Sequence, residues 1–557
     1  VSYSADGINI LKKENIMIKV FMFFLIIFVS DVYAQYTQQW VNRLNGSANS
    51  FDIANNMYLD EQSNVYVYST ISNTKSTTDI SAIKYSPSGN ILWQYVYSST
   101  GIDQLQDVYK DEENYSYITG YTSVIDELKI LTIKLSPSGT VVWSRTYSAT
   151  NYTSLISQSI ITDSVGNIYV LLDGRNISTS FINCVLIKYD QSGNLVSQVL
   201  FEGSSTGDNH GVKLIEDSFG NIFAGVNSVF ASFGFDILIY KLNNNLNEIY
   251  SKRISGAANS DDGIVDMKLS GDNNLLLTAK ITNAGNTSDI GTFKINNSNG
   301  DILWQNSYNG SGNNIDLPYS IATDNQNNVL VTGFIRNANI SGSEDIVTLK
   351  YDSNGNLLWS KIYNDSTNGI DQGFSICSDA QNNVYVGGTA DYGNLRNGYI
   401  TLKYDALGNL LWKGVYRFIT LSEDFIYKIA VNNSQDIFLT GISFSDSTDY
   451  DVTTIKYARQ TGIYSNAEYV NDFKLYTNYP NPFNPSTKIR FYNPQRNFIT
   501  VKVFDLNGRE IALLENRSLV EGNYEYEFSP QNLSSGVYFY RVYYGENFKS
   551  GKMILSK

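Results

Sequence analysis

The stretches KYDSNGNLLW (residues 350–359) and KYDALGNLLW (residues 403–412) decide the fold, because this ten-residue pattern recurs along the chain. It reads KYSPSGNILW at 84–93 and KLSPSGTVVW at 134–143, and weaker copies begin at Lys188, Lys241, Lys294 and Lys456. The eight leading lysines are spaced 50 to 56 residues apart. Self-similarity at a period of this size indicates a repeat architecture.

A second pattern lies between these copies. It is an aspartate followed four residues later by alternating apolar residues, as in Asp324 before NVLVTG and Asp379 before NVYVGG. All six tryptophans occupy one point of the repeat, which indicates a repeated packing role. The alternation predicts short strands, and Gly-Asn predicts a tight hairpin turn before the last of them. Four-stranded units at this period predict the blades of a β-propeller.

The two ends of the repeat array predict how the ring closes. Trp40 lies on an outer-type strand with no unit before it, whereas the unit at Lys456 has no tryptophan strand after it. The first strand would therefore complete the last blade and remove the open sheet edges. We expect an all-β fold with an eight-bladed propeller over residues 36–462, and seven blades plus an irregular segment is the alternative.

This repeat resembles the SBBP family of bacterial β-propeller repeats. The resemblance rests on the pattern D-I-x-T-x-K-Y-D-x-x-G-N-L-L-W and is closest at residues 345–359 and 379–412. Ser197 and Tyr250 stand where other copies have tryptophan, which predicts looser outer strands in those two units. Repeats of this family occur on secreted and surface proteins, so the resemblance implies architecture more than activity.

The amino-terminal region has the features of an export signal. Residues 20–29 (VFMFFLIIFV) follow three lysines and precede Val-Tyr-Ala at 32–34. An apolar run of this length is about half of what spans a bilayer, so it predicts a secretory signal peptide rather than a transmembrane anchor. We expect residues 1–34 to be an upstream extension and signal peptide, with Met17 as the start.

The carboxyl-terminal region differs in pattern from the repeats. After a linker at 463–472, residues 473–557 show alternating strands with Asn-Gly and Ser-Gly turns, which predict a small immunoglobulin-like β-sandwich. This module resembles the type A carboxyl-terminal sorting domain of the type IX secretion system. The residues that carry the resemblance are Tyr479, Pro480, Asn481, Pro482, Phe483, Gly508, Gly536, Tyr538 and Lys552.

The resemblance implies that the type IX secretion machinery is a partner of residues 473–557. It also implies that the protein is secreted or attached to the outer surface of a Gram-negative-type bacterium. The alternative is an immunoglobulin-like spacer of the flagellar-hook-cap type, which shares the Asn-Pro-Phe-Asn-Pro opening.

Composition narrows the chemistry. The 557 residues include 54 acidic and 40 basic side chains, so the net charge of −14 disfavours nucleic-acid binding. Catalysis by histidine would have to use His210, with Asp208 nearby, although a polar turn residue is the preferred interpretation. Cys184 and Cys377 lie far apart in the repeat array and are expected to be buried. The repeated lysine is expected to pack its stem on the sheet with its ammonium at the rim.

One aligned position near the start of the inner strand carries a carboxylate in six of the eight units. These residues are Asp52, Asp103, Asp262, Asp316, Asp371 and Asp424, whereas Leu155 and Asn209 occupy the position in the other two. Since inner strands line a propeller's channel, the alignment predicts a carboxylate ring, with a calcium ion as a candidate cofactor that offsets the repulsion. The alternative is that each aspartate accepts backbone N–H bonds in its own blade.

These features predict an exported propeller that binds a glycan, a protein or a matrix component and that is not an enzyme. No catalytic residue is assigned from the sequence, and no cofactor other than calcium is expected. The alternatives are a secreted polysaccharide-degrading enzyme with carboxylates in the propeller mouth and a structural spacer in a surface layer.

Overall fold

The computed structural model describes residues 36–557 except for 74–76, 125–126, 202–206, 231–233, 257–259, 284, 286, 338–341, 366–368, 394–396, 418–422, 446–447, 461–472, 494–496, 507, 521, 532 and 545–546. The chain divides into two compact units, one formed by Ala34–Thr461 and one that holds Gly462–Lys557. The described residues form strands and turns, and no helix occurs among them. The expected signal peptide and the linker at 463–472 lie outside the described residues.

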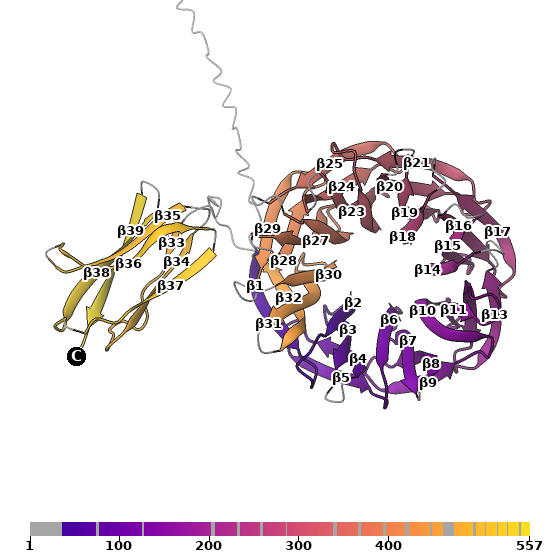
Figure 1. The fold of residues 1–557 in the computed structure, drawn as a ribbon, viewed down its shortest axis with the longest axis horizontal. Coiled ribbons are helices and arrows are strands. Elements are labelled where there is room, and N and C mark those ends of the chain that lie inside the picture. The colour runs from indigo at the N-terminus through magenta and orange to yellow at the C-terminus, as the bar shows by residue number, and fades with distance from the viewer. Residues whose placement is uncertain are drawn as a thin grey trace, which may run out of the picture. The chain divides into compact units, whose positions relative to one another are not determined.

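The first unit contains eight four-stranded antiparallel sheets in its described residues, arranged as a ring (Figure 1). Each sheet runs from an inner strand, such as β6 or β18, to an outer strand at the periphery, such as β9 or β21. Sheet 1 comprises β2 (Ile53–Leu59), β3 (Val65–Ser72), β4 (Thr78–Tyr85) and β5 (Ile91–Tyr97), and sheet 2 comprises β6 (Asp103–Lys110), β7 (Ser116–Val124), β8 (Glu127–Leu135) and β9 (Val141–Tyr147). Sheet 3 comprises β10 (Tyr152–Thr162), β11 (Ile168–Asn176), β12 (Ile182–Tyr189) and β13 (Leu195–Phe201), and sheet 4 comprises β14 (Asn209–Glu216), β15 (Ile222–Val229), β16 (Phe235–Leu242) and β17 (Glu248–Ile254).

The second half of the ring continues the same order. Sheet 5 comprises β18 (Gly263–Leu269), β19 (Leu275–Thr282), β20 (Ser288–Ile295) and β21 (Ile302–Tyr308), and sheet 6 comprises β22 (Leu317–Thr323), β23 (Val329–Arg336), β24 (Glu344–Tyr351) and β25 (Leu357–Tyr363). Sheet 7 comprises β26 (Gln372–Ser378), β27 (Val384–Asp391), β28 (Asn397–Tyr404) and β29 (Leu410–Tyr416). Sheet 8 comprises β30 (Asp424–Val431), β31 (Ile437–Ser445) and β32 (Asp449–Arg459), together with β1 (Tyr36–Leu44) from the start of the chain.

Strand β1 closes the ring as its outer-strand pattern predicts. It pairs antiparallel with β32, and Trp40 lies opposite Lys456, the register that Trp359 and Lys350 adopt in sheet 6. The Arg43 guanidinium fixes the closure by an ion pair of 2.7 Å with Asp451. The predicted completion of the last sheet by the first strand is therefore confirmed. With β1 in place, the last sheet has four strands like the other seven, and β32 is not left as an outer edge.

The apolar cores of the propeller lie between neighbouring sheets. One cluster joins Tyr68 and Ile80 of sheet 1 to Val108 and Leu131 of sheet 2, and a similar cluster joins sheet 8 to sheet 1. The middle strands are buried on both faces, so they consist of near-continuous apolar and small polar residues. Each sheet therefore needs its neighbours, which is why the repeats form a closed array.

The second unit is a sandwich of two sheets. One sheet has the order β33 (Lys474–Leu475), β34 (Thr487–Asn493) and β37 (Gly522–Phe528), and the other has the order β36 (Glu510–Leu519), β35 (Asn497–Phe504), β38 (Gly536–Tyr544) and β39 (Asn547–Leu555). Its core includes Phe473, Phe491, Val501, Tyr540 and Met553. The predicted all-β fold, a propeller followed by a small β-sandwich, is confirmed.

Candidate functional site

The tryptophans of the repeat join each outer strand to the next sheet. The indole N–H of Trp304 donates to the Ser353 carbonyl at 3.0 Å, and that of Trp359 donates to Ala406 at 3.1 Å. The ring of Trp304 covers Gly355, where a Cβ would come within 2.7 Å of it. Gly355 also has a φ of +87°, so the hairpin requires glycine on two counts. The tryptophan position is therefore structural, as its repetition indicates.

The two sheets without this tryptophan use other side chains. The Tyr250 hydroxyl donates to the Asn296 carbonyl at 3.2 Å, and its ring covers Gly300. At the turn that would lie under residue 197, glycine is replaced by Leu246, which is buried in the core between sheets 3 and 4. The expectation of looser outer strands is therefore not supported at Tyr250, since that side chain reproduces the contact to the next turn.

The recurring lysine forms buried ion pairs. Lys350 and Asp324 lie 2.8 Å apart, with side chains 2% and 0% exposed. The same pairing joins Lys84 to Asp60 and Lys241 to Asp217, whereas Lys294 and Lys456 pair with Asp272 and Asp436, which follow the aligned position by two and four residues. Burial by itself raises the pKa of Asp324, but hydrogen bonds from Lys350 and Asn328 outweigh it and lower that pKa. The expectation of an ammonium at the rim is thus wrong, because the aspartate of the second pattern lies inside the sheet and draws the lysine inward.

The six predicted site carboxylates are buried within their own parts of the ring. Asp52, Asp103, Asp316, Asp371 and Asp424 are 0% exposed and Asp262 is 2% exposed. Asp371 illustrates the contacts: it accepts the Asp365 amide at 2.7 Å and the Asp391 amide at 3.0 Å. Two backbone amides also bind three of the others: those of Gly46 and Ser72 for Asp52, of Gly256 and Thr282 for Asp262, and of Gly310 and Arg336 for Asp316. Asp103 accepts from the Ser99 amide and from the Ser99 and Thr122 hydroxyls. Asp424 accepts from the Ser443 hydroxyl.

We call this arrangement the aspartate clamp, because five of the six carboxylates join the loop after the preceding outer strand to their own sheet, and Asp424 accepts from Ser443 of its own sheet. Burial is the main reason why the pKa of Asp52 is raised to about 6 and that of Asp371 to about 7. The structure does not bring the six carboxylates together, and the described residues contain no group of three His, Cys, Asp or Glu placed to hold a metal ion. The geometry favours the backbone role over the carboxylate ring. A bound calcium ion stays a prediction, which a calcium titration of thermal stability would test.

The central channel lies four residues further along each inner strand. There, a cavity of about 580 Å³ is lined by the inner strands of the ring. The residue four positions after the clamp position follows a β-bulge in every sheet and lines this cavity. These residues are Asn56, Asp107, Ser159, Lys213, Asp266, Ser320, Ser375 and Lys428. We call them the channel ring.

Several members of the channel ring link neighbouring inner strands. Asp107 accepts the Ile160 amide at 3.0 Å, Asp266 accepts the Ile321 amide at 3.0 Å, and Ser375 accepts the Ile429 amide at 3.3 Å. Lys213 forms an ion pair with Asp266 of the next sheet. Burial raises the pKa of Asp107, whereas Lys213 outweighs the effect of burial on Asp266 and lowers its pKa. The channel therefore combines charges of both signs in a confined space.

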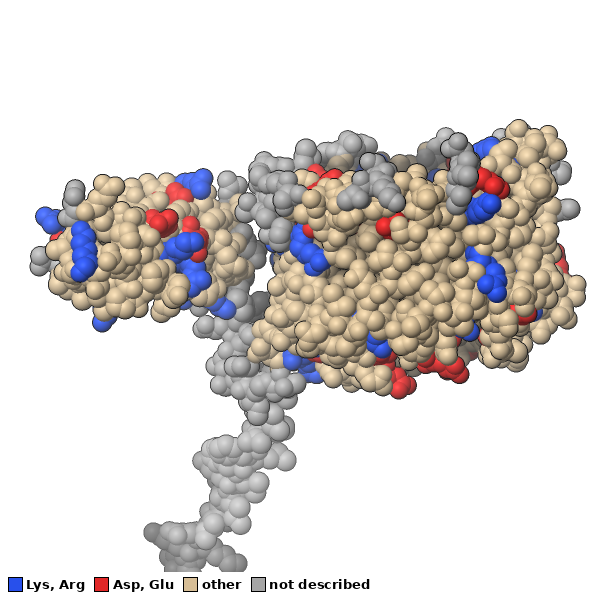
Figure 2. Space-filling model, turned by 90° about the horizontal axis from the view of Figure 1, so that it is seen from below, with Lys and Arg blue, Asp and Glu red and all other residues tan. Residues whose placement is uncertain are grey.

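The sequence interpretation missed the channel ring, although a signal was present. Among the aligned units, the clamp position is nearly constant, whereas the position four residues later carries asparagine, aspartate, serine or lysine. Because the polar residue at this inward-facing position differs between repeats, its identity is not required for the fold of each sheet. By contrast, the side of the propeller wall seen in Figure 2 shows few charged side chains between its two faces.

His210 pairs with an aspartate other than the one expected. Its Nδ1 lies 2.8 Å from Asp173 of sheet 3, and this hydrogen bond is the main reason why its pKa is raised. Asp208 instead accepts the Ile182 amide at 2.7 Å. Within the described residues, His210 has no Ser, Thr or Cys as a hydrogen-bond partner. The contacts therefore give His210 an inter-sheet link, in keeping with the preferred interpretation.

The two cysteines differ. Cys184 is buried in the core, as expected, but Cys377 is only partly buried and lines the central channel. Burial is the main cause that raises the pKa of the Cys377 thiol to about 12.

Two of the residues that carry the sorting resemblance, Asn481 and Phe483, bind the last strand of the sandwich, β39. The Asn481 side chain donates to the Lys552 carbonyl at 3.1 Å and accepts the Ile554 amide at 2.9 Å. The backbone of Phe483 bonds to Ile554 and Ser556, and its ring is 1% exposed. Tyr479 is 70% exposed, Gly508 has a φ of +78° in a turn, and the Tyr538 hydroxyl donates to the Ser534 carbonyl at 2.8 Å. Gly536 begins β38, and Pro480 and Pro482 lie in the segment that faces the last strand.

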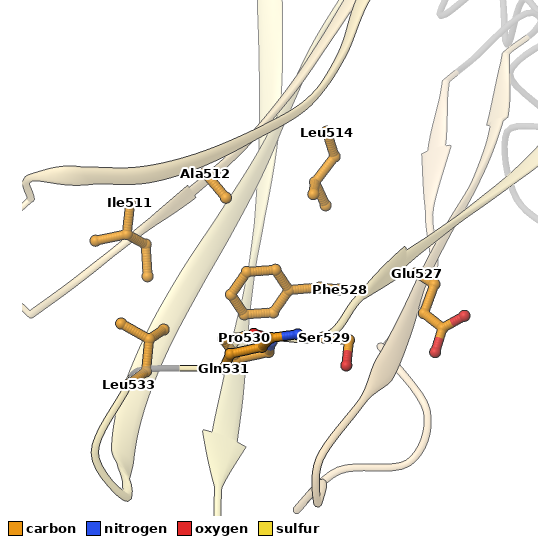
Figure 3. A pocket seen from close by; sticks show the side chains of 9 residues that line it. All are labelled: Ile511, Ala512, Leu514, Glu527, Phe528, Ser529, Pro530, Gln531 and Leu533. Carbon is orange, nitrogen blue, oxygen red and sulfur yellow. The ribbon is translucent and has the colours of Figure 1, made fainter.

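The sandwich also has an apolar groove of about 610 Å³ beside β36 and β37 (Figure 3). Ile511, Leu514, Phe528 and Leu533 surround it, and Glu527 lies at one side. None of the residues that carry the sorting resemblance lines this groove.

Comparison with known proteins identifies the second unit. Residues 477–556 match the family described as secretion system C-terminal sorting domain. No curated protein matches the chain. In the part of the chain that the structure describes, no helix has the length and apolar character needed to cross a membrane.

Solved structures similar to the chain include propellers of several kinds. Quinohemoprotein alcohol dehydrogenase from Comamonas testosteroni is 10% identical with a TM-score of 0.45, covering 78% of each chain. The WD40 domain of SCAP from fission yeast is 10% identical with a TM-score of 0.42, covering 76% of this chain and 95% of that one. The β-propeller domain of the trilobed protease from Pyrococcus furiosus is 7% identical with a TM-score of 0.34, covering 62% and 91%. The family match makes residues 477–556 a secretion system C-terminal sorting domain, and with the ring of four-stranded sheets the protein that carries it is a β-propeller protein secreted or placed at the outer cell surface.

Proposed function

We propose that the protein is an exported binding module whose propeller takes a ligand into its central channel. The observation that carries this proposal is the channel ring, whose polar side chains vary between otherwise similar repeats. A cavity of about 580 Å³ lies within the size range of ligand sites, and its wall also includes the aromatic side chains of Tyr58 and Tyr109. Aromatic rings beside polar groups suit a glycan, a protein side chain or a matrix component.

The test is a binding screen of the full chain against glycan and matrix-protein arrays. Ser320→Trp places a large ring in the channel, and Ser144→Trp places the same ring on the exposed outer strand β9. We expect the channel variant to lose at least tenfold in affinity and the outer variant to bind as the unchanged chain does. Equal binding by both variants would show that the ligand does not use the channel.

Export is proposed to depend on recognition of residues 473–557 by the type IX secretion machinery. Removing these residues is expected to leave the propeller inside the cell envelope, measured by fractionation of the producing bacterium. Exchanging Leu513, which is 51% exposed, for serine is the control that leaves the motif residues intact. Normal export of the shortened chain would contradict the proposed partner.

A second function, cleavage of a polysaccharide, is favoured by one observation. Asp107 and Asp266 both line the channel, and their surroundings shift their pKa values in opposite directions. Such a difference suits a general acid and a base or nucleophile. A hydrolysis screen with Asp107→Asn and Asp266→Asn decides it, since no turnover by the unchanged chain would exclude this function for the substrates screened.

A further inference from the structure

Lys428 differs from the rest of the channel ring in having no hydrogen-bond or ion-pair partner among the described residues. The other seven members each take part in a hydrogen bond or ion pair: Asn56, Asp107, Ser159, Lys213, Asp266, Ser320 and Ser375. The Lys428 ammonium, by contrast, has no hydrogen-bond or ion-pair partner among the residues that the structure describes. Its side chain is half-buried on β30 and lines the channel.

The part of the channel around Lys428 is rich in donors. Sheets 5 to 8 present Lys268 at one side and Lys428 at the other, with the Ser320 and Ser375 hydroxyls and the Cys377 thiol between them along the ring. Lys268 is exposed and, like Lys428, has no partner within the described part of the chain. These side chains supply hydrogen-bond donors and two positive charges, neither of which forms an ion pair within the described residues.

The carboxylates of the channel are already engaged. Asp266 is paired with Lys213 and also accepts the Ile321 amide. Asp107 accepts the Ile160 amide in the other half of the ring, and Glu216 accepts the Ser164 amide at 3.0 Å. Asp266 and Asp107 therefore act on Lys428 only through space, and no carboxylate of the described lining residues forms an ion pair with it.

An ammonium in such a place is costly. Burial, and then the nearby positive charge of Lys213, lowers the pKa of Lys428; the charges of Asp266 and Asp107 oppose this shift without outweighing it, and Lys268 adds to it. A partly buried charge without a partner loses hydration, and a hydrogen-bonding group of opposite charge offsets that loss most strongly. An anion from solution would supply that group and would also reduce the repulsion between the lysines.

We propose that the half of the channel formed by sheets 5 to 8 binds an anionic group, a carboxylate, sulfate or phosphate, between Lys428 and Lys268. This inference rests on the proposed function, because it names the chemical class of ligand that the channel takes. Ser375 would donate a hydrogen bond to the anion, Ser320 would do so in exchange for its 3.5 Å contact with Asp266, and the cavity limits the ligand to a small molecule or to the end of a longer one.

The experiment is isothermal titration of the full chain with sodium sulfate, sodium phosphate and sodium glucuronate at constant ionic strength, with glucose as the neutral control. We expect at least one anion to bind and glucose not to bind, and the ranking of the three distinguishes the source of the anionic group. Lys428→Met and Lys268→Met should each weaken binding at least tenfold. Lys252→Met on the outer strand β17 should leave it unchanged. Unaltered binding by Lys428→Met, or no binding of any anion, would overturn the proposal.

Cys377 provides a second measurement that needs no substitution. It lines the same channel, whereas Cys184 is 0% exposed, so modification by N-ethylmaleimide reports on the channel, in an incubation long enough for the free chain to react despite the raised pKa of the thiol. We expect the best-binding anion to slow modification of Cys377 at least threefold and glucose to leave the rate unchanged. Equal rates with and without the anion would contradict the site even if Lys428→Met does not fold.

The two proposals fail in different ways. If the array ligand is lost from Ser320→Trp but retained by Lys428→Met, the channel site stands and the anionic ligand class is wrong. If Ser320→Trp retains the array ligand, the channel function is wrong, whereas the salt titration still decides whether Lys428 binds anions.

Discussion

The aspartate clamp and the channel ring lie four residues apart on the same inner strands, yet they obey opposite rules. The clamp position repeats aspartate in six of eight sheets and is almost wholly inaccessible, with each carboxylate satisfied by backbone or hydroxyl donors. The channel ring changes from sheet to sheet and faces a cavity. In a repeat protein, constancy thus marks residues that build each unit, and variation at an inward position marks residues that can serve a ligand.

Among the residues that build each sheet, substitution of the buried ion pair should lower the unfolding free energy most. Lys350→Met leaves the Asp324 carboxylate buried without its ammonium, which costs about 3–5 kcal/mol of unfolding free energy. Lys361→Met, on the partly exposed outer strand β25, should change it by less than about 0.5 kcal/mol. Urea denaturation measures both, and a loss below about 1 kcal/mol for Lys350→Met would contradict the role of the pair.

The clamp should come next in size. Asp371→Ala leaves the Asp365 and Asp391 amides without their acceptor, which is expected to cost about 2–4 kcal/mol. Thermal or urea denaturation measures the loss, and Ser144→Ala on the exposed face of β9 is the control. A neutral Asp371→Ala would mean that these amides find other partners.

The clamp also predicts a pH dependence. Folded Asp371 binds a proton below a pKa of about 7, whereas the unfolded chain binds it only below about 3.8. Between these values the folded state holds more protons, so the contribution of Asp371 to stability falls as the pH rises through this window. The difference in stability between the unchanged chain and Asp371→Asn should therefore be more favourable to the unchanged chain at pH 5 than at pH 8. A difference independent of pH would exclude the raised pKa.

The contact between the residue at the tryptophan position and the turn of the next sheet gives a test with a smaller expected loss of stability, in which a second substitution should restore what the first removes. Ser197→Trp introduces the usual ring above a turn where Leu246 replaces glycine, and overpacking of this kind costs about 1–3 kcal/mol. Adding Leu246→Gly should recover most of that loss, because it recreates the pair seen at Trp304 and Gly355. Additive losses in the double variant would show that the two positions do not contact each other.

The smallest effect on stability is expected in the channel ring. Lys428→Met removes an ammonium without a partner, so the unfolding free energy should change by less than about 1 kcal/mol or increase slightly. Together with loss of anion binding, this result would separate the channel ring from the clamp. A loss comparable to that of Asp371→Ala would instead place Lys428 among the residues that build the blade.

The sequence alone determined the strands, the repeat and the closure. The alternation of apolar residues, the Gly-Asn turns and the unmatched outer strand at Trp40 are local or periodic features, and the pairing of β1 with β32 follows from them. The motif of the sorting domain was also readable, because its residues are consecutive or regularly placed in the chain.

Only the tertiary structure decided which polar groups meet. Spacing placed the six aspartates near the channel, but a β-bulge between them and the channel ring turns the next polar side chain inward while the aspartate meets the neighbouring loop. The repeat period of the sequence predicts neither the direction of a side chain at a bulge nor the hydrogen-bond donors that another repeat contributes. For the same reason, Lys350 was predictable as a repeated structural residue but not as half of a buried ion pair, and the unpartnered Lys428 became visible only once its seven counterparts were seen to be engaged.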